Sequence, residues 1–215
     1  MKYRGVLFDM DGTVLSTLED LTDSVNAALA HFSMPGRSLD EVRCFIGNGA
    51  KRLIDLSVPR GTDEELAAQV LDWYKSWYDA HCRIKTAPYE GIIWLLETLK
   101  AKGVKLAVVS NKPDRAVKIL AEDFFPGLLE TAVGESAGIR RKPWPDTVEL
   151  AMRELGLEKE DCVYIGDSEV DVETADRLPM DCISVDWGFR SREELEKAGA
   201  HCIVNTAQEL YEKLI

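Results

Sequence analysis

Residues 7–17 read LFDMDGTVLST, and this stretch is the most informative about the fold. An apolar run ends here in Asp9 and Asp11, followed by a Gly-Thr pair. An Asp-Gly pair is common in hairpin turns, and aspartates at alternate positions are typical of calcium loops. The calcium loop needs a glycine where Val14 stands, and the hairpin needs a second strand where residues 16–32 have a helical pattern. The stretch therefore predicts a buried strand that leads into a helix.

Along most of the chain, short apolar runs alternate with amphipathic segments. The runs are continuously apolar, which is typical of parallel strands covered by helices on both faces. Their alternation with helices predicts an α/β fold with a doubly wound, Rossmann-like parallel sheet. The expected strands are RGVLF (4–8), VKLAVVS (104–110), TAVGE (131–135), DCVYIG (161–166), DCISV (181–185) and HCIVN (201–205).

One interval interrupts this alternation. Between the strand that ends at Phe8 and the strand that begins near Val104, the sequence has no convincing strand and reads as helices. We therefore expect an all-helical domain at residues 16–87, inserted into an α/β core domain made of residues 1–15 and 88–215.

The stretch TDEELAAQVLDWYKSWYDAHC, residues 62–82, is a predicted helix of this insert. Helical spacing places several of its large side chains on one side, and we interpret this stripe as the core of a helix bundle. The stripe consists of Leu66, Val70, Trp73 or Tyr74, and Trp77.

Composition limits the classes of function. The chain has 215 residues and a net charge of −12, which argues against nucleic acid as a partner because phosphate backbones attract basic surfaces. No apolar run approaches the roughly 20 residues of a membrane span. The N-terminus runs directly into the first strand, so we expect no signal peptide. The five scattered cysteines suit a reducing, cytoplasmic location. The sequence leaves a monomer and a homodimer open.

Polar side chains follow several of the expected strands. In an open parallel sheet, ligands bind beyond the carboxyl ends of the strands, so these residues should meet at one edge. Each alone could be a helix cap or a solvated charge, but their convergence is hard to attribute to capping. The set consists of Asp9 and Asp11, Ser110 and Asn111, Lys142 in the segment RRKPWP, and Asp167, Glu169 and Asp171.

So many carboxylates cannot all be ionised side by side without a cation, because like charges raise one another's pKa. Mg²⁺ resolves the conflict, since it prefers oxygen ligands and is commonly bound together with substrate phosphates. A nucleophilic carboxylate, a second carboxyl group, a metal and a lysine are suited to phosphoryl transfer. Lys142, with Arg140 and Arg141 beside it, would supply local positive charge on an acidic protein.

The segments FDMDGTV, VVSN, KPWP and GDSEVD, in this order, resemble the four motifs of the haloacid dehalogenase superfamily of phosphohydrolases. The similarity spans nearly the whole chain, and the helical insert resembles the class I cap of that superfamily. The stretches FIGNGAKRLI and VDWGFRSREELEKAGAHCIV are similar to those of bacterial phosphoglycolate phosphatases and their relatives.

The resemblance implies a role for each matching residue. Asp9 would be the nucleophile that accepts the phosphoryl group, and Asp11 the acid and base. The residues expected to bind or orient the phosphoryl group are Thr13, Ser110, Asn111 and Lys142. The residues expected to hold Mg²⁺ are Asp9, Asp11 through its carbonyl oxygen, and Asp167, with Asp171 supporting the metal shell.

The expected substrate is a small phosphate monoester, and 2-phosphoglycolate is favoured. Its carboxylate would need a cation from the insert, and Lys51 or Arg52 is the candidate, although both could equally be solvated. Pyrophosphate, sugar phosphates and nucleotides stay open as substrates. The superfamily commonly has an Asp-Ser pair where this chain has Ser16 and Thr17, at the hinge between the core and the insert.

Two other functions share some of these features. A phosphomutase such as β-phosphoglucomutase shares all four motifs but typically has a histidine soon after the first, and none lies between Thr13 and Ala30. A non-catalytic phosphate-binding relative would be expected to lose Asp9, Asp11 or Lys142, and all three are present. The sequence therefore favours a phosphatase.

Overall fold

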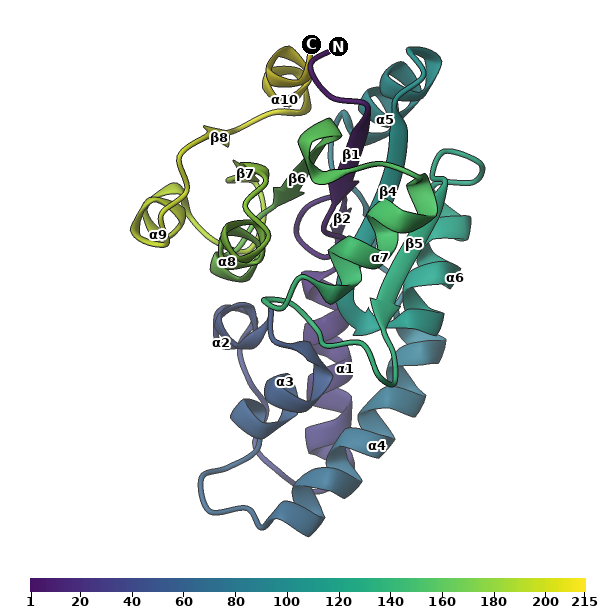
Figure 1. The fold of residues 1–215 in the computed structure, drawn as a ribbon. Coiled ribbons are helices and arrows are strands. Elements are labelled where there is room, and N and C mark those ends of the chain that lie inside the picture. The colour runs from purple at the N-terminus through teal and green to yellow at the C-terminus, as the bar shows by residue number, and fades with distance from the viewer. The chain divides into compact units, whose positions relative to one another are not determined.

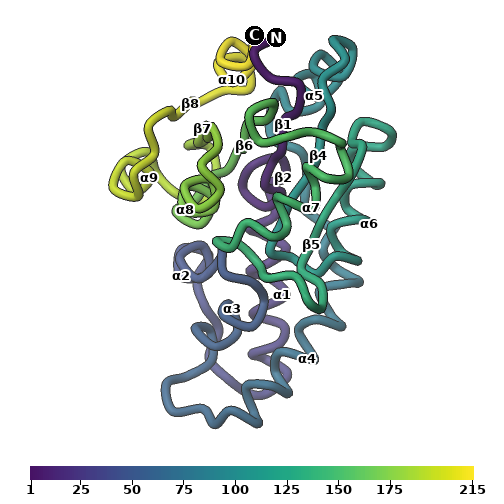
Figure 2. The backbone as a smooth tube through the Cα atoms, viewed as in Figure 1, coloured from purple at the N-terminus to yellow at the C-terminus, as the bar shows by residue number.

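The computed structural model describes all residues from 1 to 215, in two compact units (Figures 1 and 2). The first unit consists of Met1–Leu15 together with Pro88–Ile215, and the second of Ser16–Ala87. The chain therefore leaves the first unit after its first strand and returns to it once.

The first unit is built on a six-stranded sheet in which every pairing is parallel. All six strands lie where the apolar runs predicted them, because continuously apolar segments bury both sides of a strand. In sheet order the strands are β5 (Thr131–Glu135), β4 (Lys105–Pro113), β1 (Gly5–Phe8), β6 (Cys162–Gly166), β7 (Asp181–Val185) and β8 (Ile203–Val204).

Helices cover both faces of this sheet (Figure 1). Side chains of α7 and α8 pack with those of β1, β4, β5 and β6 in one buried cluster, and α5 contacts both β4 and α10. The two chain ends lie side by side, where the backbone N–H of Lys2 donates to the Leu214 carbonyl at 3.0 Å (Figure 2). The helices are α5 (Ile92–Ala101), α6 (Asp114–Phe124), α7 (Asp146–Leu155), α8 (Glu169–Arg177), α9 (Arg192–Lys197) and α10 (Ala207–Leu214), with a 3-10 turn at Lys159–Asp161.

The strand order places β1 at the centre, with β4 on one side and β6 on the other. The chain fills the β4 side first and then crosses to the β6 side, so the order reverses beside β1. Ligands of doubly wound sheets bind at such a reversal, beyond the carboxyl ends of the strands. The pairing of β4 with β5 is also irregular between Val109 and Pro113. Irregularities of this kind re-aim side chains, and this one falls on the segment Ser110–Lys112.

The second unit is helical and contains α1 (Leu18–His31), α2 (Leu39–Phe45), α3 (Gly49–Ser57) and α4 (Glu64–His81). On α4, Val70 and Tyr74 are buried as predicted, but the prediction for Trp77 is wrong. Trp77 is 37% exposed and Tyr78 is 5% exposed. Trp77 instead stacks on Trp73 and His81 along the outer side of the helix.

Two very short strands, β2 (Leu15–Ser16) and β3 (Ala87–Pro88), pair at the two points where the chain passes between the units. The expectation of no strand between Phe8 and Val104 is wrong here. A strand of two residues is too short to produce a periodic pattern of apolar residues, so the sequence could not reveal these strands.

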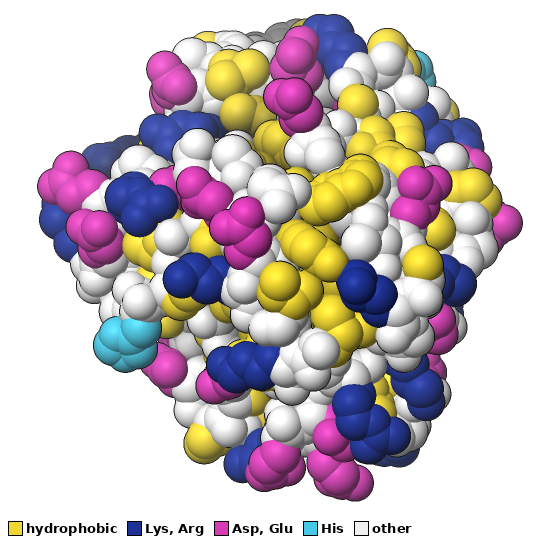
Figure 3. All heavy atoms as spheres, turned by 90° about the horizontal axis from the view of Figure 1, so that it is seen from above, with side chains coloured by type: hydrophobic (Ala, Val, Ile, Leu, Met, Phe, Trp, Pro, Cys, Tyr) yellow, Lys and Arg dark blue, Asp and Glu magenta, His cyan; other side chains and the backbone are white.

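Charged side chains of both signs lie on the surface. On the face drawn in Figure 3, Lys and Arg are interspersed with Asp and Glu and form no continuous basic stripe. None of the helices combines the length and the apolar character needed to cross a membrane.

Candidate active site

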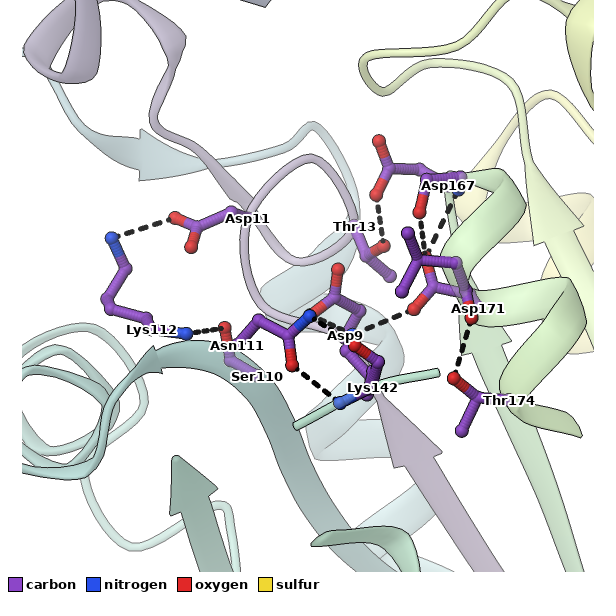
Figure 4. A network of polar contacts seen from close by, with 12 residues as sticks. Asp9, Asp11, Thr13, Ser110, Asn111, Lys112, Lys142, Asp167, Asp171 and Thr174 are labelled. Atoms are coloured by element: carbon purple, nitrogen blue, oxygen red, sulfur yellow. Dashed lines mark hydrogen bonds and ion pairs between the residues drawn. The ribbon is translucent and has the colours of Figure 1, made fainter. Parts of the chain in front are cut away.

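Asp9 lies directly after β1, at the carboxyl edge of the sheet (Figure 4). Its backbone N–H donates to the Ile165 carbonyl of β6 at 2.8 Å, which fixes the position of the residue between strands. Its Oδ1 atom lies 2.8 Å from Nζ of Lys142. Asp9 is 8% exposed, so its carboxyl group is largely buried but not sealed from solvent.

Lys142 is the buried cation of this site, with 2% of its side chain exposed. Besides contacting Asp9, Nζ donates to the hydroxyl of Tyr164 at 2.9 Å and to Oδ1 of Asp171 at 2.8 Å. The backbone around Lys142 is held by Asn111, whose Oδ1 accepts from the Lys142 N–H and whose Nδ2 donates to the Lys142 carbonyl. Asn111 thus positions the lysine through its side chain.

Asp167 and Asp171 follow β6 and lie beside Asp9. Thr13 donates to Oδ1 of Asp167 at 3.1 Å, and the backbone N–H of Phe189 donates to Oδ2 at 2.7 Å. Oδ2 of Asp171 accepts from the N–H and the hydroxyl of Ser168. Carboxylate oxygens of the three aspartates lie within 4.8 Å of one another.

Glycines make room for these carboxylates. A Cβ atom on Gly12 or Gly188 would lie 2.3 or 2.4 Å from side-chain atoms of Asp167, and one on Gly166 would lie 2.3 Å from Asp171. Gly12 also has a φ of +86°, which other residues rarely adopt. Two loops and a strand end therefore need glycine so that the acidic groups can approach one another.

Burial and charge determine protonation in this cluster. Burial raises the pKa of Asp9 to about 7; the carboxylate of Asp171 adds to the rise, and Lys142 opposes it. Burial, followed by the charges of Asp171 and Asp9, raises the pKa of Asp167 well above its ordinary value. Burial disfavours the charge on Lys142, but the carboxylates of Asp171 and Asp9 outweigh it and raise the lysine's pKa well above 10.5. Lys142 alone therefore does not offset the burial of Asp9 and Asp167, and the cluster fits a further cation.

Asp11 points away from this cluster, toward Lys112 (Figure 4). The distance between Nζ of Lys112 and Oδ1 of Asp11 is 3.3 Å, and that oxygen makes no hydrogen bond. Ser110 lies at the irregular part of β4, where its Oγ accepts from the Lys112 N–H at 3.2 Å. Glu169, the remaining carboxylate of the predicted set, forms an ion pair with Arg190 at 2.7 Å. The other predicted core residues meet at one sheet edge, and the two aspartates of the first motif face different lysines. These residues are Asp9, Asp11, Thr13, Ser110, Asn111, Lys142, Asp167 and Asp171.

The model of the haloacid dehalogenase-like hydrolase family matches residues 6–185 of this chain. The chain belongs to this family. As a member with phosphatase relatives, it is a phosphoric monoester hydrolase. The four motifs, read from the sequence as a resemblance, lie within the matched residues.

Individual relatives extend this result over the whole chain. Phosphoglycolate phosphatase 1 of Pseudomonas aeruginosa is 29% identical over 214 residues, covering 96% of this chain and 78% of the relative. The phosphoglycolate phosphatase of Colwellia psychrerythraea is 30% identical over 212 residues, covering 95% and 94%. The crystal structure of a candidate phosphoglycolate phosphatase from Lactobacillus delbrueckii subsp. bulgaricus is 41% identical, with a TM-score of 0.95 and coverage of 100% and 99%.

The two predicted substrate contacts of this haloacid dehalogenase-like hydrolase lie in the helical unit. Lys51 and Arg52 are both exposed in the first half of α3. Lys51 already forms an ion pair with Asp55, one helical turn away, at 2.7 Å. The structure shows the two cations on a solvated helix, so their contact with substrate stays a prediction.

Sequence reasoning missed two residues of the site. Tyr164 is fully buried, accepts from Lys142 and donates to Asp171 at 3.1 Å. The sequence feature that could have indicated it is a side chain with a hydroxyl group in the otherwise apolar strand DCVYIG, two residues before the strand ends. Lys112 was also missed, although it directly follows Ser110 and Asn111 in the sequence.

Proposed function

We propose that this phosphatase hydrolyses 2-phosphoglycolate in a Mg²⁺-dependent reaction, through a phosphoryl group carried on Asp9. The contact of the Asp9 carboxylate with a buried lysine, at the point where the strand order reverses, carries this proposal. The names of the relatives support the substrate, and all were matched over most of their length.

Asp9 acts as the nucleophile. One oxygen of its carboxylate attacks phosphorus, the bond between phosphorus and the ester oxygen breaks, and an aspartyl-phosphate results. Lys142 holds the attacking carboxylate at 2.8 Å and balances charge on the phosphoryl oxygens. Thr13, Ser110 and Asn111 orient the group through hydrogen bonds from hydroxyl groups and backbone N–H groups.

Asp11 transfers the protons. It donates one to the leaving ester oxygen and then removes one from the water molecule that attacks phosphorus. That second attack breaks the bond between Asp9 and phosphorus and releases inorganic phosphate. The Asp11 oxygen nearest Lys112 makes no hydrogen bond, so only the ion pair has to yield when the carboxyl group turns toward the substrate.

The residues present fit a divalent metal ion. Asp9 and Asp167 would hold Mg²⁺ together with the carbonyl oxygen of Asp11. Asp171, the third member of the acidic cluster, would support these ligands. Both oxygens of Asp171 already accept hydrogen bonds, which suits a supporting role. When bound, Mg²⁺ would neutralise part of the charge that the phosphoryl group and the carboxylates bring together.

The helical unit, residues 16–87, is proposed to act as a cap that selects the leaving group, with Lys51 or Arg52 contacting the carboxylate. We also propose a cytoplasmic enzyme, supported by the absence of disulfides among the five cysteines. Whether it works as a monomer or as a homodimer does not enter this mechanism.

The test is phosphate release from a panel of small phosphate esters, with and without a chelator, by the wild type and Asp9→Asn. We expect release from 2-phosphoglycolate above the other esters, abolished by the chelator and by the substitution. Preference for a neutral sugar phosphate or a nucleotide would overturn the substrate. Undiminished activity of Asp9→Asn would overturn the mechanism.

A further inference from the structure

Lys112 is a second buried cation at the site, and the proposed mechanism gives it no role in catalysis. It lies near the end of β4, directly after the phosphate-binding pair Ser110 and Asn111. Only 4% of its side chain is exposed, and Nζ lies 3.3 Å from Oδ1 of Asp11. Burying an ammonium group is costly, so a position this close to the reacting groups calls for a function.

The two buried lysines lie on different sides of the first motif (Figure 4). Lys142 contacts Asp9, the nucleophile, and therefore lies where the phosphoryl group is transferred. Lys112 contacts Asp11, the general acid, which must reach the ester oxygen of the leaving group. A cation held beside the acid is therefore close to whatever the leaving oxygen carries.

We propose that Lys112 binds the anionic end of the leaving group and makes the enzyme selective for phosphate esters that carry a carboxylate next to the ester carbon. The inference rests on the proposed function and names a specificity residue in the core domain. In 2-phosphoglycolate a single methylene separates the ester oxygen from the carboxylate, so an ammonium beside the general acid can reach it. When Asp11 turns toward the ester oxygen, its ion pair with Lys112 opens, and the ammonium group can then donate to the substrate carboxylate.

The charges of the site agree with this role. Four carboxylates, those of Asp9, Asp11, Asp167 and Asp171, surround the reaction centre. A trianionic substrate entering there needs positive charge on its leaving side as well as on its phosphoryl side. Lys112 supplies it from near the end of β4, where its backbone N–H donates to Oγ of Ser110 at 3.2 Å.

The test compares two esters that differ only at the relevant group, 2-phosphoglycolate and 2-hydroxyethyl phosphate. Lys112→Met keeps an unbranched side chain of nearly the same length but removes the charge. We expect the ratio of kcat/KM for 2-phosphoglycolate to kcat/KM for the neutral ester to fall about 30-fold, mainly through KM. Lys112→Arg, which keeps the charge, should recover part of the ratio.

Lys118→Met is the matched control, since Lys118 is an exposed lysine paired with Asp114 on α6, and its ratio should equal that of the wild type. An equal loss of kcat for both esters in a folded Lys112→Met variant would overturn the inference, because the lysine would then act only through Asp11. A wild type that prefers the neutral ester would overturn both the inference and the proposed substrate. Loss of preference in the variant alone, from a wild type that prefers 2-phosphoglycolate, supports both.

Discussion

Two buried acidic sites, one in each unit, show how differently a fold can use an aspartate. In the helical unit, Asp20 is 2% exposed and accepts hydrogen bonds from the backbone N–H groups of Ile84, Lys85 and Thr86 and from the Thr86 hydroxyl, at 2.8–3.1 Å. All its donors come from one segment of three residues. Asp20 thereby fastens the end of the helical unit to α1.

In the core unit, the oxygens of Asp9, Asp167 and Asp171 face one another, and one lysine lies among them. Their donors come from several elements, and burial still raises the pKa of Asp9 and Asp167. A carboxylate that accepts hydrogen bonds from local N–H groups stabilises a fold. Buried carboxylates that lie close together with too little positive charge are suited to bind a cation and to react. The comparison predicts that substitutions at the two sites affect different properties.

Among the lysine substitutions, the largest effect on activity is expected from Lys142→Met. The substitution leaves Asp9 and Asp171 without their common cation and removes charge from the phosphoryl side. We expect kcat/KM for 2-phosphoglycolate to fall about 10³-fold, with the protein still folded by circular dichroism. A loss of less than tenfold would contradict the role given to this lysine.

Asp20→Ala should have the opposite profile. It leaves three N–H groups and the Thr86 hydroxyl without their acceptor, and the Thr86 groups are buried, so we expect the free energy of unfolding to fall by about 3 kcal/mol, measured by urea denaturation. The kcat of the folded fraction should stay within about twofold of the wild type. Asp23→Ala, which removes an exposed carboxylate paired with Lys85, is the control and should change stability by less than about 1 kcal/mol. An Asp20→Ala variant that is stable but inactive would show that Asp20 acts in catalysis and not in stability.

The raised pKa of Asp9 predicts how stability depends on pH in protein freed of metal. Its ordinary value is 3.8 and its value in the fold is about 7, so between these values the folded protein holds a proton that the unfolded chain has released. The free energy of unfolding should therefore fall as pH rises through this window, by up to about 1.4 kcal/mol per pH unit from this group.

Asp9→Asn removes this group, so the stability of the variant relative to the wild type should increase from the lower end of the window to the upper. Urea denaturation at several pH values measures the difference. Parallel curves for the two proteins would show that the Asp9 carboxyl group is not destabilised by the fold.

The smallest effect is expected in the helical unit. Lys51 is exposed and paired with Asp55, so its charge is well solvated. Replacing both Lys51 and Arg52 by Ala should raise KM for 2-phosphoglycolate only a few-fold, by about 1 kcal/mol or less, and leave kcat unchanged. An unchanged KM would remove these residues from the substrate site, and a rise comparable to that of Lys112→Met would transfer selectivity from the core to the helical unit.

The sequence predicted the sheet and the meeting of the motifs at its edge, because strands buried on both faces have an unmistakable composition and their carboxyl ends must coincide. It could not predict which lysine Asp11 faces, since that depends on an irregular pairing after Val109. It also placed Trp77 in the core, whereas stacking on neighbouring rings holds that side chain outside. Directions of individual side chains depend on packing, which spacing alone does not specify.

If Asp9 carries the phosphoryl group, the intermediate can be trapped on the enzyme. Wild-type enzyme with Mg²⁺ is mixed rapidly with 2-phosphoglycolate labelled on phosphorus, quenched in acid and digested. We predict label on the peptide that contains Asp9, and homoserine at position 9 after borohydride reduction of the acyl phosphate. Turnover that leaves no label on the protein, or label on another residue, would show that Asp9 does not carry the phosphoryl group.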